Sequence, residues 1–404
     1  MTIDRQQAER LWTILVCGAL ILTLTTGLRQ ALGLFLKPMT MDLGVGREVF
    51  GFGIALQNLL WGLGSPFAGA VADRFGTVRV SALGGLFYAL GLAAMAYSSS
   101  GTSLVLGTLI IGIGLAGAGF STVLGAVGRA APPEKRSMAL GIATAGGSFG
   151  QFAVVPMGHV VLDAFGWQMA LVILAGVALI MLPLSLGLSE GQKTIQHQQK
   201  QTVGEALGEA FRHPSYWYLV AGFFVCGFHV AFVVTHLPAY LADRAMPEWL
   251  GAWSLALVGL FNIIGSWGCG WLGGKYSKKR LLSVLYFGRA LVFLIFIFMP
   301  LSPFSVLLFA GSLGLLWLGT VPLTSGLVAQ MFGPANMSML YGIVFLSHQF
   351  GSFFGAWLGG KAFDLTGSYD LMWWLSVALG VFSGLVNLPI REAPVSRLQA
   401  TAAQ

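Results

Sequence analysis

The sequence predicts an all-α membrane protein with twelve transmembrane helices, and three observations support this fold class. Of the 404 residues, 56% are hydrophobic and only 9% are charged. Apolar runs of about 20 residues recur along nearly the whole chain, each long enough to cross a ~30 Å hydrocarbon layer. The 56 glycines suit the close approach of membrane helices. A soluble protein of this size could not bury so much apolar surface.

Each predicted span is an apolar run bounded by charged or turn-forming residues. The spans cover residues 11–36, 49–72, 79–98, 102–128, 137–161, 166–188, 215–241, 250–273, 281–299, 304–330, 338–362 and 370–389. The first run has no small-residue cleavage site and precedes eleven more, so we expect it to be an anchor and not a removable signal peptide.

The distribution of basic residues predicts the orientation. With a cytoplasmic N-terminus, the cytoplasmic segments carry 16 Lys and Arg, the outer segments carry four, and two lie within spans. This bias follows the positive-inside rule, so we expect both termini to be cytoplasmic in a multi-pass protein of the cell inner membrane. The net charge of +7 then reflects topology, and no nucleic-acid partner is expected.

A hydrophilic stretch at residues 189–214 separates six spans from six. We therefore predict an N-terminal six-helix bundle at 1–188, a cytoplasmic linker at 189–214 and a C-terminal six-helix bundle at 215–404. The Gln- and Lys-rich start of the linker, GQKTIQHQQKQ, is typical of flexible chain, and TVGEALGEAFR predicts a short amphipathic surface helix.

The two halves repeat with a constant offset of 201 residues. Matching pairs are Ser137 and Ser338, Asp163 and Asp364, Gly166 and Gly367, and Gly69 and Gly270. An even number of spans per half makes the repeats parallel in topology. This arrangement predicts two pseudo-symmetric bundles with a substrate site between them near the bilayer midplane.

The loop after the second span reads GAVADRFGTVR. It resembles the G-x-x-x-D-R-x-G signature of the major facilitator superfamily, at the place where that family carries it. A degenerate copy follows the eighth span, with Gly274 in place of the acid and Ser277 in place of the last glycine. The resemblance covers the whole chain and implies the major facilitator fold and transport by alternating access. The residues it marks as gating are Gly69, Asp73, Arg74, Gly76, Arg79 and Lys275.

Two interpretations of this loop remain open. Asp73 can cap a helix start or pair with a cation on the facing half, which would hold one conformer closed. Alternatively, the loop is a charged turn that only sets the topology.

Basic side chains remain within the predicted spans, whereas all 15 acidic residues lie in terminal, loop or span-edge positions. Ionisable groups at bilayer depth usually face a protein interior or a water-filled cavity. Positive groups at this depth, without acidic groups beside them, indicate that the protein binds or transports an anion. Away from the span ends, the basic residues within spans are Arg29, Arg289, His229, His236 and His348.

Arg29 is the best-placed candidate for substrate binding. It lies eight residues before Lys37, about 12 Å along a helix, and Lys37 already occupies the interfacial position. In the resembled family the first, fourth, seventh and tenth spans line the central cavity. The alternative is that Arg29 pairs with another residue within its own half.

The other predicted substrate-binding residues are mid-span polar groups. His229 corresponds by the offset to Leu28, beside Arg29, and His348 and Gln349 lie mid-span in the eleventh helix. The full predicted set is Arg29, His229, His348, Gln349, Asn262 and Gln57. The alternative for each is a hydrogen bond between helices. His236 and Arg289 are predicted to be structural, and the three cysteines to be buried apolar residues without metal or disulfide spacing.

An enzyme is not expected, because the sequence contains no phosphate loop, nucleophilic triad or metal cluster. No cofactor is predicted, and no hydrophilic segment is long enough for a nucleotide-binding domain. The expected partners are a small anionic substrate, the lipid bilayer and protons, with the protein a monomer.

Arginine binds carboxylates in a bidentate manner, which favours a carboxylate-bearing substrate. The chain resembles the monocarboxylate and oxalate–formate branch, whose first span often carries a basic residue where Arg29 lies. It departs from that branch in span eight, which has Asn262 and Ser266 and no arginine.

We therefore predict a secondary transporter of a small organic anion, in the first place a monocarboxylate. Anion exchange, facilitated diffusion, and proton coupling through His229, His348 or the substrate itself stay open. The alternatives are an efflux carrier for an amphipathic drug- or siderophore-like compound and a non-transporting receptor or scaffold.

Overall fold

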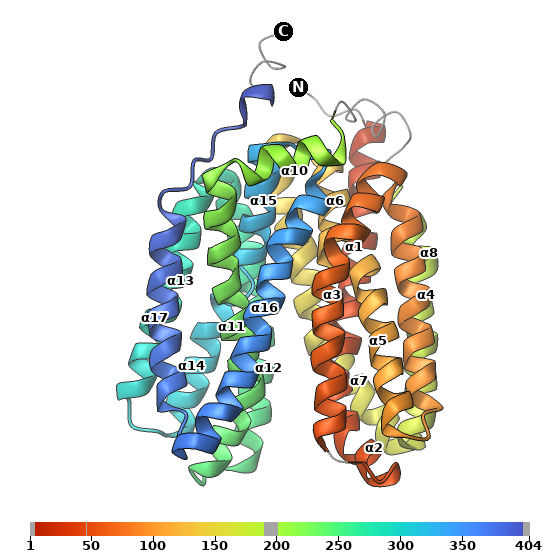
Figure 1. Ribbon diagram of the computed structural model, residues 1–404, viewed down its shortest axis with the longest axis vertical. Helices are drawn as coiled ribbons and strands as arrows, with labels where there is room; N and C mark the ends of the chain where they lie inside the picture. Colours follow the sequence, from red (N-terminus) through yellow and green to blue (C-terminus); the bar gives the residue numbers. More distant parts are fainter. Residues whose placement is uncertain (1–4, 46, 190–200, 399–404) are drawn as a thin grey trace. The chain divides into compact units, whose positions relative to one another are not determined.

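A computed structural model describes residues 5–45, 47–189 and 201–398. Over these residues the chain is helical and contains no strand (Figure 1). Ten helical segments of this part are long and apolar enough to cross a membrane. Two more long helices, α3 (Arg47–Phe75) and α16 (Met337–Thr366), cover the second and eleventh predicted spans. The chain is thus the predicted all-α membrane protein with twelve spans.

The helices group into two compact units. Unit 1 comprises Met1–Pro132, Gly146–Val203 and Pro334–Gly342. Within it both α4 and α3 pack along α5. Its elements are α1 (Arg5–Ala31), η1 (Leu32–Phe35), α2 (Leu36–Asp42), α3, α4 (Thr77–Ala96), α5 (Gly101–Ala118), α6 (Phe120–Ala130), most of α7 (Pro133–Leu179), α8 (Met181–Leu186) and the start of α16.

Unit 2 comprises Pro133–Ala145, Gly204–Gly333 and Ile343–Gln404. Within it α13 packs along α17, and α12 packs along α14. Its elements are the start of α7, α10 (Val203–Phe211), α11 (Pro214–Asp243), α12 (Glu248–Lys275), α13 (Lys278–Phe298), α14 (Pro303–Leu315), α15 (Thr320–Phe332), the rest of α16 and α17 (Asp370–Asn387).

The beginnings of α7 and α16 follow the sequence repeat. Unit 2 contains Pro133–Ala145 with the start of α7, and unit 1 contains Pro334–Gly342 with the start of α16; the first residues of these two segments differ by the offset of 201. The predicted division into bundles at residues 188 and 215 stays a prediction.

Glycines let these helix starts pack closely within each unit. A Cβ on Gly69 would lie 2.5 Å from the carbonyl oxygen of Ser338, at the start of α16. A Cβ on Gly270 would lie 2.5 Å from Cα of Gly141, near the start of α7. Backbones come this near only when small residues line the contact. The pairing of Gly69 with Gly270 in the sequence thus corresponds to two similar helix contacts.

Gly166 and Gly367, another predicted pair, adopt the same kind of backbone. Gly166 has φ of 71° and interrupts α7 between the fifth and sixth spans, and Gly367 has φ of 69° between α16 and α17. Glycine alone adopts such angles without steric cost. The repeat is therefore visible in the backbone as well as in the sequence.

The fourth and tenth spans are each divided into two helices, a feature that the hydropathy pattern does not predict. The fourth span is α5 followed by α6, with an extended backbone at Gly119 (φ −88°, ψ −169°). The tenth span is α14 followed by α15, interrupted at residues 316–319. Non-helical backbone at membrane depth requires partners for its polar groups from neighbouring helices.

The predicted amphipathic helix of the linker is confirmed as α10, which turns Ala206 and Ala210 inward. The predicted flexible start of the linker falls on residues 190–200, which lie outside the described residues.

Candidate functional site

Arg29 lies in the last turn of α1 and reaches toward α3. Its Nη1 donates to Oδ1 of Asn58 at 3.4 Å, and its Cζ lies 5.4 Å from the ring centroid of Trp61. A guanidinium over an indole face is attracted by the ring quadrupole. Unit 1 thus holds this cation with an amide and a ring.

Within the described residues no carboxylate pairs with Arg29. A guanidinium has five N–H donors in a planar fork, and one of them is engaged by Asn58. The side chain is only partly buried. The arrangement can therefore accept an anion, and the fork geometry suits a carboxylate.

Trp61 connects Arg29 to the interruption of the fourth span. Its ring stacks on Phe120, the first residue of α6, with centroids 6.5 Å apart. A Cβ on Gly119 would lie 2.8 Å from Nε1 of Trp61. The indole therefore fills the space beside the break, and the guanidinium of Arg29 covers the indole.

Gln57 is fully buried in α3. Its two side-chain polar atoms have no hydrogen-bond partner among the described residues. Buried amides without partners are costly, so such a group is a reasonable ligand contact.

His229 of α11 packs toward α13 and α17. One ring nitrogen, Nε2, lies 2.9 Å from the carbonyl oxygen of Ser376, and the ring centroid lies 4.9 Å from that of Phe293. Nδ1 has no partner among the described residues. His236, predicted to be structural, has Nε2 2.8 Å from the carbonyl oxygen of Ala356.

His348 and Gln349 lie in α16 and are both buried. The His348 ring stacks on Phe345 at 5.4 Å and lies 5.0 Å from Phe223, and its Nδ1 is 3.5 Å from Oγ of Ser352. His229 and His348 thus have different sets of partners.

Asn262 and Arg289 both bind the interruption of the tenth span. Oδ1 of Asn262 accepts from the backbone N–H of Leu318 at 2.9 Å. Arg289, which is fully buried, donates from Nε to the carbonyl of Leu316 at 2.9 Å and from Nη2 to that of Trp317. These bonds satisfy backbone groups that the helix leaves unpaired, which agrees with a structural role for Arg289. The oxygen of Asn262 is occupied in the same way.

Asp73, near the end of α3, is the centre of a buried cluster in unit 1. Its carboxylate accepts from the backbone N–H of Ser338 at 3.3 Å and of Met339 at 2.9 Å, at the start of α16. It also forms a buried ion pair with Arg129 of α6. Arg129 donates in addition to Oγ1 of Thr77 at 2.9 Å. An anion at a helix N-terminus is favourable because orphan N–H groups point at it.

Arg129 is a member of this cluster that the sequence does not single out, because its position predicts only the topology. A signal was present, since Arg129 directly follows the fourth apolar run and Asp73 directly follows the second, on the same side of the membrane.

The remaining predicted gating residues have less direct roles. Gly76 has φ of 94° and forms the turn before α4, which only glycine adopts easily. Arg74 and Arg79 are exposed. Nζ of Lys275 lies 3.9 Å from the ring centroid of Trp271. Gating by these four residues stays a prediction.

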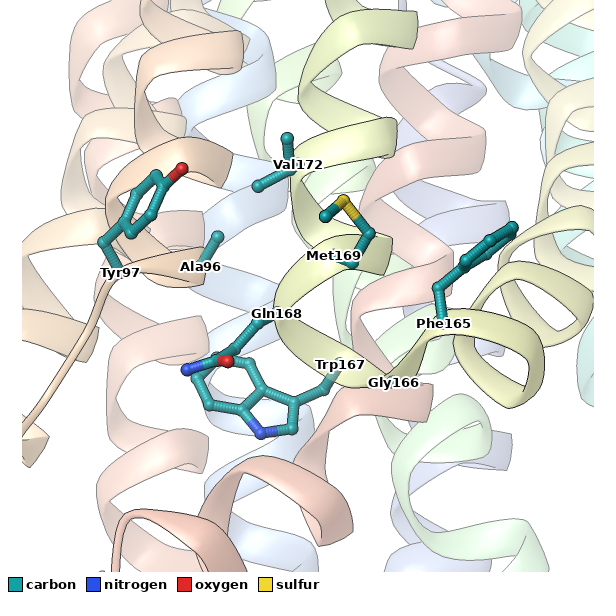
Figure 2. A pocket seen from close by; sticks show the side chains of 8 residues that line it. All are labelled: Ala96, Tyr97, Phe165, Gly166, Trp167, Gln168, Met169 and Val172. Atoms are coloured by element: carbon teal, nitrogen blue, oxygen red, sulfur yellow. The ribbon is translucent and has the colours of Figure 1, made fainter.

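A pocket lies elsewhere in unit 1, between the end of α4 and the second half of α7 (Figure 2). It has a volume of about 350 Å³. Its lining residues are Ala96, Tyr97, Phe165, Gly166, Trp167, Gln168, Met169 and Val172. This lining contains no charged side chain, so the pocket is not suited to an anion.

Comparison with known proteins gives consistent results. Residues 15–356 match the sequence profile of the Major Facilitator Superfamily. The chain is 26% identical over 398 residues to the uncharacterized MFS-type transporter YcxA of Bacillus subtilis, covering 93% of this chain and 94% of that one. It is 27% identical over 394 residues to monocarboxylate transporter 4 of Rattus norvegicus, covering 93% of this chain and 82% of that one.

Among solved structures, the proton:xylose symporter XylE aligns with a TM-score of 0.78 at 14% identity, covering 98% of this chain and 99% of that one. The Escherichia coli fucose:proton symporter FucP aligns with a TM-score of 0.67 at 17% identity, covering 93% and 98%. At these identities the structures indicate the fold alone. The profile match spans most of the chain and agrees with its twelve spans and signature loop, and the protein therefore belongs to the major facilitator superfamily.

Proposed function

We propose that the protein is a secondary transporter of a small organic anion, in the first place a monocarboxylate, and that Arg29 binds the substrate carboxylate. The observation that carries this proposal is the environment of Arg29, a partly buried cation that Asn58 and Trp61 contact and with which no carboxylate of the described residues pairs. A transported carboxylate would supply the missing counter-charge and two hydrogen bonds at once.

The relatives support the same substrate class. Several of them are named monocarboxylate transporters, with identities of 25–27% over more than four-fifths of this chain. Such identities leave the substrate itself open, so the carboxylate is inferred from Arg29 and not from the names.

Further substrate contacts are proposed at the other buried polar groups that the sequence predicts. Gln57 has a buried amide without partners, and His348 and Gln349 are polar groups within α16. His229 and Asn262 are proposed as weaker substrate contacts. One ring nitrogen of His229 and the side-chain oxygen of Asn262 already bind backbone groups. Coupling to protons or exchange against a second anion are the two modes that we propose.

The bias of basic residues supports cytoplasmic termini in a bacterial-type inner membrane, with bundles at 1–188 and 215–404 joined by the linker 189–214. In that orientation the cluster of Asp73, Arg129 and the start of α16 lies at the cytoplasmic end. We propose that it acts as a latch that is formed when this end is closed.

The test is uptake of radiolabelled lactate and pyruvate into proteoliposomes, with and without an imposed pH gradient. Wild type should accumulate label, and Arg29→Gln should lose saturable uptake. The matched control is Arg244→Gln, which removes an exposed arginine that stacks on Tyr240. Equal uptake by wild type and Arg29→Gln would refute the anion site. Absence of monocarboxylate uptake together with export of amphipathic compounds would favour the efflux carrier instead.

A further inference from the structure

The buried cluster in unit 1 joins the ends of three helices through side chains. Arg129, at the end of α6, donates to Thr77 at the start of α4 at 2.9 Å and pairs with Asp73 of α3. The cluster therefore includes an acid, a cation and a hydroxyl, and of these three only the acid belongs to the G-x-x-x-D-R-x-G signature.

The repeat places a second version of this cluster in unit 2. The offset of 201 residues maps Thr77 onto Lys278 and Arg129 onto Gln330. In unit 2, Nζ of Lys278 donates to Oε1 of Gln330 at 2.8 Å. The same two positions are therefore bonded in both units. The cation is at the end of α6 in unit 1, whereas in unit 2 it is at the start of α13.

The acid is missing from its repeat position, because Asp73 maps onto Gly274. A different carboxylate is present beside the same helix ends, that of Glu392, five residues after the end of α17. Its Oε1 accepts from the backbone N–H of Lys279 at 2.7 Å. Its charge attracts Lys278, which otherwise faces a second cation, Arg136.

The segment that carries Glu392 also binds the end of α15. We call residues 390–398 the C-terminal strap. The backbone N–H of Val395 donates to the carbonyl of Met331 at 2.9 Å, and Arg397 donates to that of Phe332 at 3.0 Å. Nε2 of Gln330 donates to the backbone carbonyl of Glu392 at 3.0 Å. The strap thus joins the start of α13 to the end of α15.

We propose that Glu392 is the gating acid of unit 2, which replaces the acid that Gly274 does not provide. The role rests on the proposed function, since it requires that the cytoplasmic helix ends separate and close during transport. Glu392 holds the closed state in two ways. Its carboxylate caps the N-terminus of α13, and its negative charge offsets the repulsion between Lys278 and Arg136. Glu392 is a positioning residue and is not expected to touch the substrate.

The experiment compares wild type, Glu392→Gln and the double variant Glu392→Gln/Gly274→Asp, all as full-length chains in nanodiscs. The double variant restores a carboxylate four residues before Lys278, the same spacing as between Asp73 and Thr77. Position 274 has room for it, because a Cβ there would lie 3.8 Å from its nearest neighbour, the carbonyl oxygen of Glu134.

The first measurement does not depend on the substrate. Spin labels on Glu9→Cys and Arg280→Cys, two exposed sites, report the distance distribution in chains whose native cysteines are replaced by serine. Glu392→Gln should raise the population of the longer distance about threefold or more, and Gly274→Asp should reverse the shift. The second measurement is uptake, in which Glu392→Gln should lower the maximal rate about fivefold with little change in KM, again reversed by Gly274→Asp.

The matched control is Glu209→Gln, which removes the partly exposed ion pair with Arg397 on the same strap and should change neither measurement. An unchanged distance distribution in Glu392→Gln, or one that Gly274→Asp does not reverse, overturns the gating role, because a merely structural cap could not be replaced from position 274. If wild type takes up no monocarboxylate, the proposed substrate fails, whereas the distance measurement still decides the role of Glu392.

Discussion

Arg29 and Arg289 are both arginines within apolar spans, and their surroundings give them different roles. Arg289 is fully buried and donates to two backbone carbonyls at the interruption of the tenth span. Arg29 is partly buried and contacts one amide and one indole. Nε and Nη2 of Arg289 bind backbone carbonyls and so stabilise the fold, whereas Arg29 binds no backbone carbonyl among the described residues and is open enough to bind a ligand. The same residue type therefore predicts opposite results on substitution.

Arg29→Gln should raise the KM for a transported monocarboxylate about 10- to 100-fold, because a charge-assisted hydrogen bond contributes ~1.5–3 kcal/mol. Arg29→Lys should give a smaller increase, since the charge remains and the bidentate fork is lost. Initial rates of uptake against substrate concentration give both values. A normal KM in Arg29→Gln would contradict the assignment.

Arg289→Leu should destabilise the protein by about 2–6 kcal/mol, because each of the two carbonyls left unpaired costs ~1–3 kcal/mol. Thermal or denaturant unfolding in detergent measures this loss. Asn262→Leu, which leaves one N–H unpaired, provides a smaller change of the same kind. Normal stability combined with lost substrate binding in Arg289→Leu would show that Arg289 belongs to the site.

At the scale of the elements, close helix contacts and interrupted helices are the features that bear on transport. Gly69 brings α3 to the start of α16, and Asp73 on the next turn accepts two N–H groups of that start. Glycine and acid therefore act together, because the acid can reach the helix end only if the backbones are close.

Gly69→Ala should weaken this contact, since the added Cβ would lie 2.5 Å from the carbonyl oxygen of Ser338. We expect the maximal rate of uptake to fall about tenfold, with KM changed far less. Gly204→Ala, where no atom lies within 4 Å of the added Cβ, is the control. A wild-type rate of uptake in Gly69→Ala would indicate that the close contact of α3 with the start of α16 is not needed for transport.

Asp73→Asn should have a related effect, since an amide still reaches the N–H groups of Ser338 and Met339 but leaves Arg129 as a buried cation without its partner. Breaking a buried pair in this way costs ~3–5 kcal/mol. The closed cytoplasmic state should lose population, which spin-label distances measure. A distribution unchanged from wild type would mean that the loop only sets topology.

At the scale of the whole molecule, the basic residues predict which side of the membrane each loop faces. Alkaline phosphatase folds only outside the cytoplasm. A fusion in the outer loop that ends at Asp370 should therefore be active, and a fusion after Arg391 should be inactive. Green fluorescent protein at the same positions should give the opposite pattern. Activity of the phosphatase at Arg391 would reverse the orientation.

Much of the architecture follows from the sequence because membrane spanning depends on local properties of the chain. The length and hydropathy of each run, the basic loops and the repeat of 201 residues can be read in order along the chain. The pairing of Gly166 with Gly367 is an example, since both positions adopt positive φ. The interruptions of the fourth and tenth spans are not readable in this way, because hydropathy does not report whether the backbone groups at Gly119 or Leu318 bind within the helix.

The sequence by itself therefore determined the fold class, the superfamily resemblance and the candidate cation Arg29. Only the tertiary structure decided which polar groups have partners. Arg129 and Ser338 reach Asp73 from 56 and 265 residues away in the chain, and Glu392 reaches Lys279 from 113 residues away. The physical reason is that burying a polar group is favourable only with a partner in place, and the folded chain brings that partner from distant segments that no local pattern links.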